Sequence, residues 1–141
     1  MIGSGIEYEE RAEEVGRLLA EAGATVVTGG RGEVMAAAAR GARNAGGTTI
    51  GILPTETREG VNAWIDHVVV TGIGHARNLA VVASGEAVIA VGGRYGTVAE
   101  IGFALTLGRP VVVLEPGWQV DGTLRATTAE EAVALALEAV A

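Results

Sequence analysis

The sequence contains no cysteine and no lysine, and all ten of its basic residues are arginine. The absence of cysteine excludes disulfide bonds, thiolate metal sites and a thiol nucleophile. Without lysine the chain cannot form the Schiff base of a pyridoxal-phosphate enzyme, and it cannot complete a Walker A phosphate loop. The function must therefore rest on arginine, carboxylates, hydroxyls and the backbone.

Aromatic side chains and long apolar runs are also scarce. Only five residues are aromatic although 49% of the chain is hydrophobic, so valine, isoleucine, leucine and alanine must form the core. The length suits one domain over residues 1–141. The chain shows no leader-like start and no apolar run long enough to span a bilayer. We expect a cytoplasmic protein without a membrane partner, and the net charge of −7 disfavours binding to a nucleic acid polymer.

Short apolar runs alternate with longer amphipathic segments along the chain. Near-continuous runs of valine and isoleucine suit parallel strands that are buried on both faces. The alternation predicts an α/β fold: a Rossmann-like, doubly wound, mainly parallel sheet with helices on both faces. Strands are expected within 24–30, 48–54, 67–74, 86–93 and 110–117, with a further short strand near 123–126. Helices are expected at 7–23, 32–46, 75–84, 97–108 and 128–140.

The first strand is a special case, because only Met1 and Ile2 precede the first glycine. It is either very short or cut short relative to related chains, and we favour a short strand.

Glycine-rich turns follow four of the expected strands, at 3–5, 28–33, 71–78 and 91–97. In an open α/β sheet this edge holds the ligand site, and a following helix N-terminus suits a phosphate. Arg31, Arg77 and Arg94 would add positive charge. The turns predict a site for a small phosphorylated, nucleotide-like ligand. The predicted binding residues are Gly3, Ser4, Gly29, Gly30, Arg31, Gly92, Gly93, Arg94, Tyr95, Gly96 and Thr97.

Two other kinds of site fit the sequence poorly. A dinucleotide site needs a carboxylate after the second strand, and here that strand ends in Thr28, Gly29 and Gly30. His67 and His75 have no carboxylate cluster at a spacing typical of metal ligands. We expect neither a dinucleotide, nor any other cofactor, nor a metal ion.

The segment VGGRYGTVAE, residues 91–100, leaves the role of Glu100 open. Thr97 and Glu100 have the spacing of a capping box, in which the threonine begins a helix and the glutamate bonds back to it. The same position would direct Glu100 toward the anion site, where it could act on a bound sugar. Glu100 is therefore a helix cap, a catalytic carboxylate or both.

The sequence of this turn resembles the Gly-Gly-x-x-Gly-Thr-x-x-Glu signature of the Lonely Guy family, whose members were long mislabelled as lysine decarboxylases. Three further blocks agree with the family in order: 28–42, 46–54 and 72–78. The resemblance implies a Rossmann-like fold, usually in dimers, and phosphoribohydrolase activity that releases the base and ribose 5-phosphate from a nucleoside 5′-monophosphate. It also implies that Arg77 and Glu100 are catalytic and that Gly92, Gly93, Gly96 and Thr97 cradle the phosphate.

Two positions depart from the active members of that family. Val91 stands where proline usually precedes the glycines, and Asn78 stands where lysine usually follows the arginine. These departures and the short chain resemble a branch that includes the molybdenum cofactor carrier proteins, which bind a phosphorylated pterin without turning it over. Two functions remain: a nucleotide phosphoribohydrolase, or a non-catalytic carrier or sensor of a phosphorylated cofactor. The lysine-free sequence is incompatible with a lysine decarboxylase that uses pyridoxal phosphate.

Two expectations concern surfaces. Segments 32–46 and 97–108 are rich in alanine, glycine and leucine on more than one face. This composition indicates burial in a homodimer or higher homo-oligomer, or against the sheet of the same chain. Trp64 and Trp118 fall in loop-like segments, near either the ligand edge or an interface.

Overall fold

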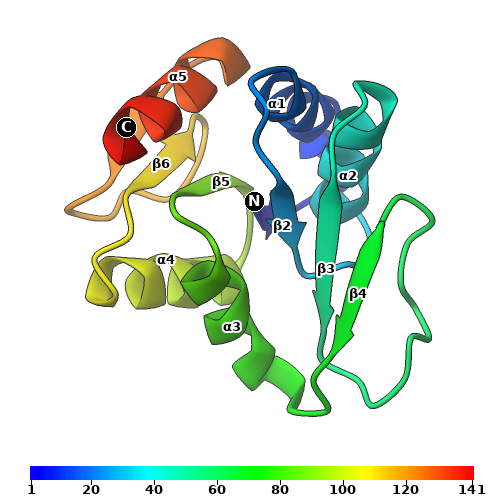
Figure 1. The fold of residues 1–141 in the computed structure, drawn as a ribbon. Coiled ribbons are helices and arrows are strands. Elements are labelled where there is room, and N and C mark those ends of the chain that lie inside the picture. Colours follow the sequence, from blue (N-terminus) through cyan, green and yellow to red (C-terminus); the bar gives the residue numbers. More distant parts are fainter.

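The computed structural model describes residues 1–141, in which parallel strands alternate with helices (Figure 1). The strands are β1 (Ile2–Ser4), β2 (Val26–Thr28), β3 (Thr49–Leu53), β4 (His67–Val70), β5 (Val88–Gly92), β6 (Val111–Leu114) and β7 (Leu124–Ala126). The α-helices are α1 (Glu9–Glu21), α2 (Val34–Asn44), α3 (Arg77–Ser84), α4 (Tyr95–Thr106) and α5 (Ala129–Val140). Short 3-10 turns, η1 (Ile6–Tyr8) and η2 (Gly74–Ala76), lead into α1 and α3. Every expected strand and helix is present, and the first strand is short.

The strands form two parallel sheets with the orders β1-β5-β6-β7 and β2-β3-β4. The Met1 nitrogen donates a hydrogen bond of 3.0 Å to the Val27 carbonyl and so links β1 to β2. The prediction of an α/β, Rossmann-like fold with a parallel sheet is confirmed. The pairing is interrupted between β1 and β2, where both strands have only three residues.

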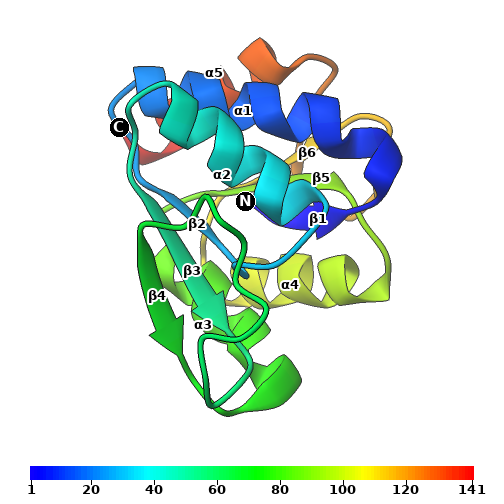
Figure 2. The ribbon, with the colours of Figure 1, turned by 90° about the vertical axis from the view of Figure 1, so that its right-hand side faces the viewer.

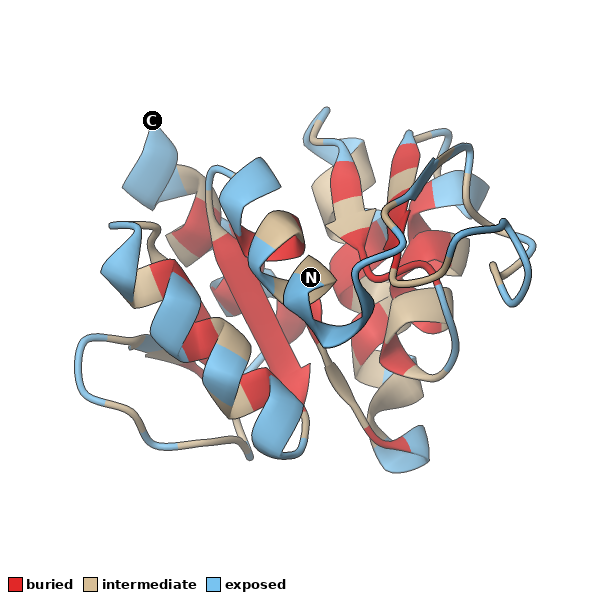
Figure 3. Ribbon diagram, turned by 90° about the horizontal axis from the view of Figure 1, so that it is seen from below, coloured by how far each residue is buried: buried red, intermediate tan, exposed pale blue.

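Helices cover the sheets on two sides: α1, α2 and α5 on one, α3 and α4 on the other (Figures 1 and 2). Each side has its own apolar core. The first joins α1, α2 and α5 through small residues such as Ala12, Ala38 and Ala132, and the second joins α3 and α4 through Val82 and Ile101. Figure 3 shows the buried residues concentrated on strands and on the inner sides of the helices.

The small residues of α2 pack against α1 within the chain. A β-carbon on Gly16 would lie 2.0 Å from the Ala38 carbonyl oxygen, and one on Gly41 would lie 1.9 Å from the Glu13 carbonyl oxygen. Such distances are too short for any side chain, so the two helices approach closely because both crossing points are glycine. Close packing with α1 therefore explains the alanine- and glycine-rich composition of α2 without a second copy.

The prediction that every valine-rich run is buried on both faces is wrong for β4. Val69 and Val70 are 47% and 43% exposed. The reason is position, because β4 is the last strand of its sheet and pairs only with β3. None of the helices combines the length and the apolar character needed to cross a membrane.

Candidate functional site

The turns after β1 and β5 lie at the same edge because these two strands pair in parallel. The turn after β2 lies beside them, since Glu33 of that turn bonds to Gly5. β1 is followed along the chain by β2, but it pairs with β5. The chain thus winds away from β1 in two directions, and open α/β sheets place their ligand sites where this happens. The candidate site lies at this point, beside the first turns of α2 and α4.

The first turn of α4 presents a row of unpaired backbone donors. The N–H groups of Gly93, Arg94, Tyr95 and Gly96 donate to no acceptor of the chain, and the first bonded amide is that of Thr97, which donates to the Arg94 carbonyl at 3.0 Å. Free amides at a helix N-terminus carry partial positive charge and bind anions. Among the predicted binding residues, this row is the arrangement that would best suit an anion.

Glycine allows the chain to turn sharply into this row. Gly92 and Gly93 have φ values of 60° and 114°, in the region that favours glycine. A β-carbon on Gly92 would lie 2.2 Å from the Tyr8 ring, and one on Gly93 would lie 2.3 Å from the Thr97 hydroxyl. Thr97 is buried, so its side chain supports the turn from within.

Arg77 reaches across from α3 to the turn after β2. Its Nη1 atom lies only 1.8 Å from where a β-carbon on Gly29 would be, so the guanidinium rests on the glycine backbone. Burial and the charge of Arg31 lower the pKa of Arg77, while Glu100 raises it. The structure therefore brings Arg31 and Glu100 each within electrostatic range of Arg77.

The arginines of the turns carry charge that the chain itself does not neutralise. All five ion pairs of the structure use other arginines, namely Arg17, Arg40, Arg43 and Arg125. Arg31, Arg77 and Arg94 form no ion pair. Their charge is available for an anion at this edge, although the whole protein is acidic.

Glu100 is not a helix cap. α4 begins at Tyr95 with Arg94 as the N-cap residue, no side chain bonds to its first turn, and Thr97 is already the third residue of the helix. Burial raises the pKa of Glu100 to about 7, while the Met1 amino group and Arg77 act in the opposite direction. Glu100 is thus a partly desolvated carboxyl group with a pKa near neutral pH.

Glu33 is a residue at this edge that the sequence did not reveal. It has a φ of 54°, the only positive value outside glycine. Its Oε2 atom accepts a hydrogen bond of 2.8 Å from the Gly5 N–H. The Glu33 carboxylate therefore occupies the free N–H of Gly5 in the glycine turn after β1. No local pattern announces this contact, because the two residues are 28 positions apart.

The remaining predicted binding residues lie at the ends of β1 and β2. A β-carbon on Gly3 would lie 1.9 Å from the Val91 carbonyl oxygen, so this glycine permits the close pairing of β1 with β5. Ser4 ends β1 at the same edge. The Gly30 N–H bonds to the Thr28 hydroxyl at 3.0 Å. A direct phosphate contact by Gly3, Ser4 or Gly30 stays a prediction.

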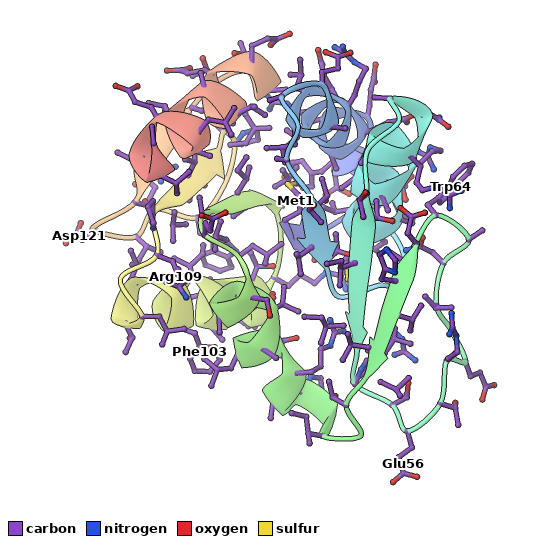
Figure 4. The ribbon with its side chains drawn as sticks, in the orientation of Figure 1. Met1, Glu56, Trp64, Phe103, Arg109 and Asp121 are labelled. Atoms are coloured by element: carbon purple, nitrogen blue, oxygen red, sulfur yellow. The ribbon has the colours of Figure 1, made fainter.

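The two tryptophans lie at different places. Trp118 donates from Nε1 to the Gly93 carbonyl at 3.2 Å, so it borders the candidate site. The Trp64 carbonyl accepts a hydrogen bond of 2.6 Å from the Thr49 hydroxyl, and Thr49 begins β3 at the opposite edge of the sheet. Figure 4 accordingly shows Trp64 far from Glu56, which follows the end of β3. No group of three histidine or carboxylate side chains could hold a metal ion.

Comparison with known proteins agrees with this architecture. The molybdenum cofactor binding protein of Rippkaea orientalis superposes with a TM-score of 0.91 at 32% identity, over 98% of this chain and 91% of that one. The molybdenum cofactor carrier protein of Chlamydomonas reinhardtii gives a TM-score of 0.85 at 32% identity, over 97% and 93%. A cytokinin riboside 5′-monophosphate phosphoribohydrolase of Mycobacterium tuberculosis is 35% identical over 82% of this chain and 67% of its own length.

The comparisons confirm the resemblance to the Lonely Guy family and to its carrier-like branch. Residues 1–140 match the model of one family over almost their entire length. The chain therefore belongs to the SLOG cluster4 family.

Proposed function

We propose that this protein binds the phosphate of a small nucleotide-like ligand at the first turn of α4. The observation that carries the proposal is the row of unpaired amides from Gly93 to Gly96. Arg94 lies within this row. Arg31, from the turn after β2, and Arg77, from the start of α3, form no ion pair with a carboxylate of the chain. A phosphate would satisfy both the amides and the arginines.

The relatives support this assignment at the level of ligand class. The two structural relatives are named for binding or carrying the molybdenum cofactor, and the mycobacterial relative is named for acting on a nucleoside monophosphate. A molybdenum cofactor and a nucleoside monophosphate both carry a phosphate, so a phosphate site would serve either kind of ligand. The primary role that we propose is binding or carriage of such a ligand.

The binding role is tested by calorimetric titration of the protein with AMP. We expect Arg77→Gln to weaken AMP binding by roughly tenfold or more, because a charge-assisted hydrogen bond to phosphate is lost. Arg17→Gln is the matched control, since Arg17 is exposed on α1 and pairs with Glu14 and Glu21. Absence of AMP binding, or equal loss in both variants, would contradict the proposal.

Hydrolysis is the second candidate function, and the state of Glu100 favours it. A carboxylate beside a bound ribose would stabilise the positive charge that develops when the N-glycosidic bond breaks. Water would then add to the sugar carbon, and the departing base would take up a proton. Because the pKa of Glu100 is raised to about 7, the reactive carboxylate would become fully populated only above neutral pH.

Release of adenine from AMP distinguishes the two functions. If the protein is a hydrolase, the rate should rise with pH through about 7, and Glu100→Gln should abolish turnover while AMP still binds. If AMP raises the melting temperature but no adenine appears at any pH, the hydrolase assignment fails and the carrier role stands.

A further inference from the structure

The loop between β6 and β7 is held in place by several arginine contacts. Arg125 donates to the Glu115 carboxylate and, from Nη1 at 2.8 Å, to the Trp118 carbonyl. Arg11 donates to the Glu115 carbonyl and, at 2.6 Å, to the Thr127 carbonyl. These bonds fix the start of the loop at Glu115 and the backbone of Trp118. The position of Trp118 is therefore set by a hydrogen bond to β7.

Trp118 is directed toward the glycine turn that precedes α4. Its ring packs partly on the core beneath α3 and α4, and its Nε1–H reaches the Gly93 carbonyl. The Gly93 carbonyl and the Arg94 N–H belong to the same peptide group, and this N–H is one of the unpaired amides. The indole thus borders the place where a phosphate would bind.

Tyr95 completes an aromatic pair at this position. It is the first residue of α4 and is 84% exposed, and its ring centroid lies 6.0 Å from that of Trp118 with the planes tilted by 40°. A ring that is so exposed contributes little to the stability of the core. Its exposed surface beside the unpaired amides is available to a ligand.

We propose that Tyr95 and Trp118 form an aromatic platform on which the flat heterocycle of the bound ligand stacks. The inference rests on the proposed phosphate site and assigns the two side chains that would hold the heterocycle of its ligand. Stacking on aromatic side chains depends on the π-face of the ring system and tolerates different bases. The platform therefore selects a class of ligand without specifying one base.

The test compares AMP with ribose 5-phosphate, which keeps the phosphate and the sugar but has no base. Binding is followed by calorimetry and by tryptophan fluorescence in a Trp64→Phe background, where Trp118 is the only indole. We expect AMP to bind about tenfold more tightly than ribose 5-phosphate and to quench the fluorescence of Trp118. Tyr95→Ser keeps the backbone N–H of position 95 but removes the ring, and it should lower the affinity for AMP to that for ribose 5-phosphate.

Two further variants separate stacking from other roles of Tyr95. Tyr95→Phe should retain the affinity for AMP, because stacking needs the ring and not the hydroxyl. Phe103→Ser, which removes another exposed ring from the same helix, should also leave AMP binding unchanged.

The outcomes that overturn the platform differ from those that overturn the phosphate site. Equal binding of AMP and ribose 5-phosphate, or equal loss of both in Tyr95→Ser, would refute the platform while the phosphate site stands. Failure of both compounds to bind would refute the phosphate site and the platform together. A changed oligomeric state of Tyr95→Ser in sedimentation would assign the ring to a contact between copies and refute the platform as well.

Discussion

Glu100 combines two opposing environments on one side chain. Its partial burial favours the neutral acid, whereas the Met1 amino group and Arg77 favour the carboxylate. Burial dominates, so the pKa is raised from 4.5 to about 7. Folding therefore stabilises the protonated form, and ionisation of this residue costs stability. Such a cost is typical of a residue kept for binding or catalysis and not for the fold.

The cost predicts a pH-dependent effect of Glu100→Gln. A group with a raised folded pKa stabilises the fold below its unfolded value of 4.5, and this contribution is lost as the pH rises through about 7. Urea unfolding should therefore find the variant close to the wild type at pH 4.5 and more stable at pH 8, by on the order of 2 kcal/mol after allowance for partial exposure. Glu138→Gln, at an exposed position of α5, controls for loss of charge alone. A gain independent of pH would contradict the assignment.

At the scale of single elements, the same sequence spacing has two outcomes. In α5 the Thr128 hydroxyl accepts from the Glu131 N–H at 3.1 Å, and the Glu131 carboxylate accepts from the Thr127 N–H at 2.9 Å. In α4 the corresponding Thr97 and Glu100 make no such bonds. The difference arises because the glycine turn starts α4 at Tyr95, two residues before Thr97. A capping motif acts only where the helix begins.

Two glycine-to-alanine substitutions test how the helices pack. Gly41→Ala should lower the free energy of unfolding by about 2 kcal/mol, because the new β-carbon would meet the Glu13 carbonyl and force α2 away from α1. Gly102→Ala, in α4 with no atom within 4 Å of the new β-carbon, should raise it by about 0.5–1 kcal/mol through helix propensity. Denaturant unfolding measures both. Similar changes in the two variants would contradict the close contact of α1 with α2.

At the scale of the whole molecule, one helical surface remains without a partner. Phe103 and Leu107 of α4 are 40% and 43% exposed, and Leu79 of the adjoining α3 is 43% exposed. Figure 4 shows Phe103 directed outward from α4. Because α2 is occupied by α1, the expected homodimer would use α4 and not both predicted helices.

A charged residue on this surface tests the dimer. We expect the wild type to sediment as a dimer at micromolar concentration and Phe103→Glu to sediment as a monomer, since an unpaired charge cannot be buried in an apolar contact. Val140→Glu, which charges an exposed apolar site at the end of α5, should leave the dimer intact. A monomeric wild type would refute the expectation.

The sequence by itself determined the order of strands and helices and the chemistry available to the site. Alternating apolar and amphipathic runs express local periodicity, and glycines mark where parallel strands end, so both are readable along the chain. The kinds of site that the absence of lysine and cysteine excludes also follow from the sequence alone.

Only the tertiary structure decided how the site residues meet. It placed the Arg77 guanidinium on Gly29, bonded Glu33 to Gly5, brought Trp118 to Gly93 and left β4 at an exposed edge. Each of these arrangements joins residues far apart in sequence or depends on which strands are neighbours. Local propensity carries no information about such contacts, because they form only when the sheets and helices pack together.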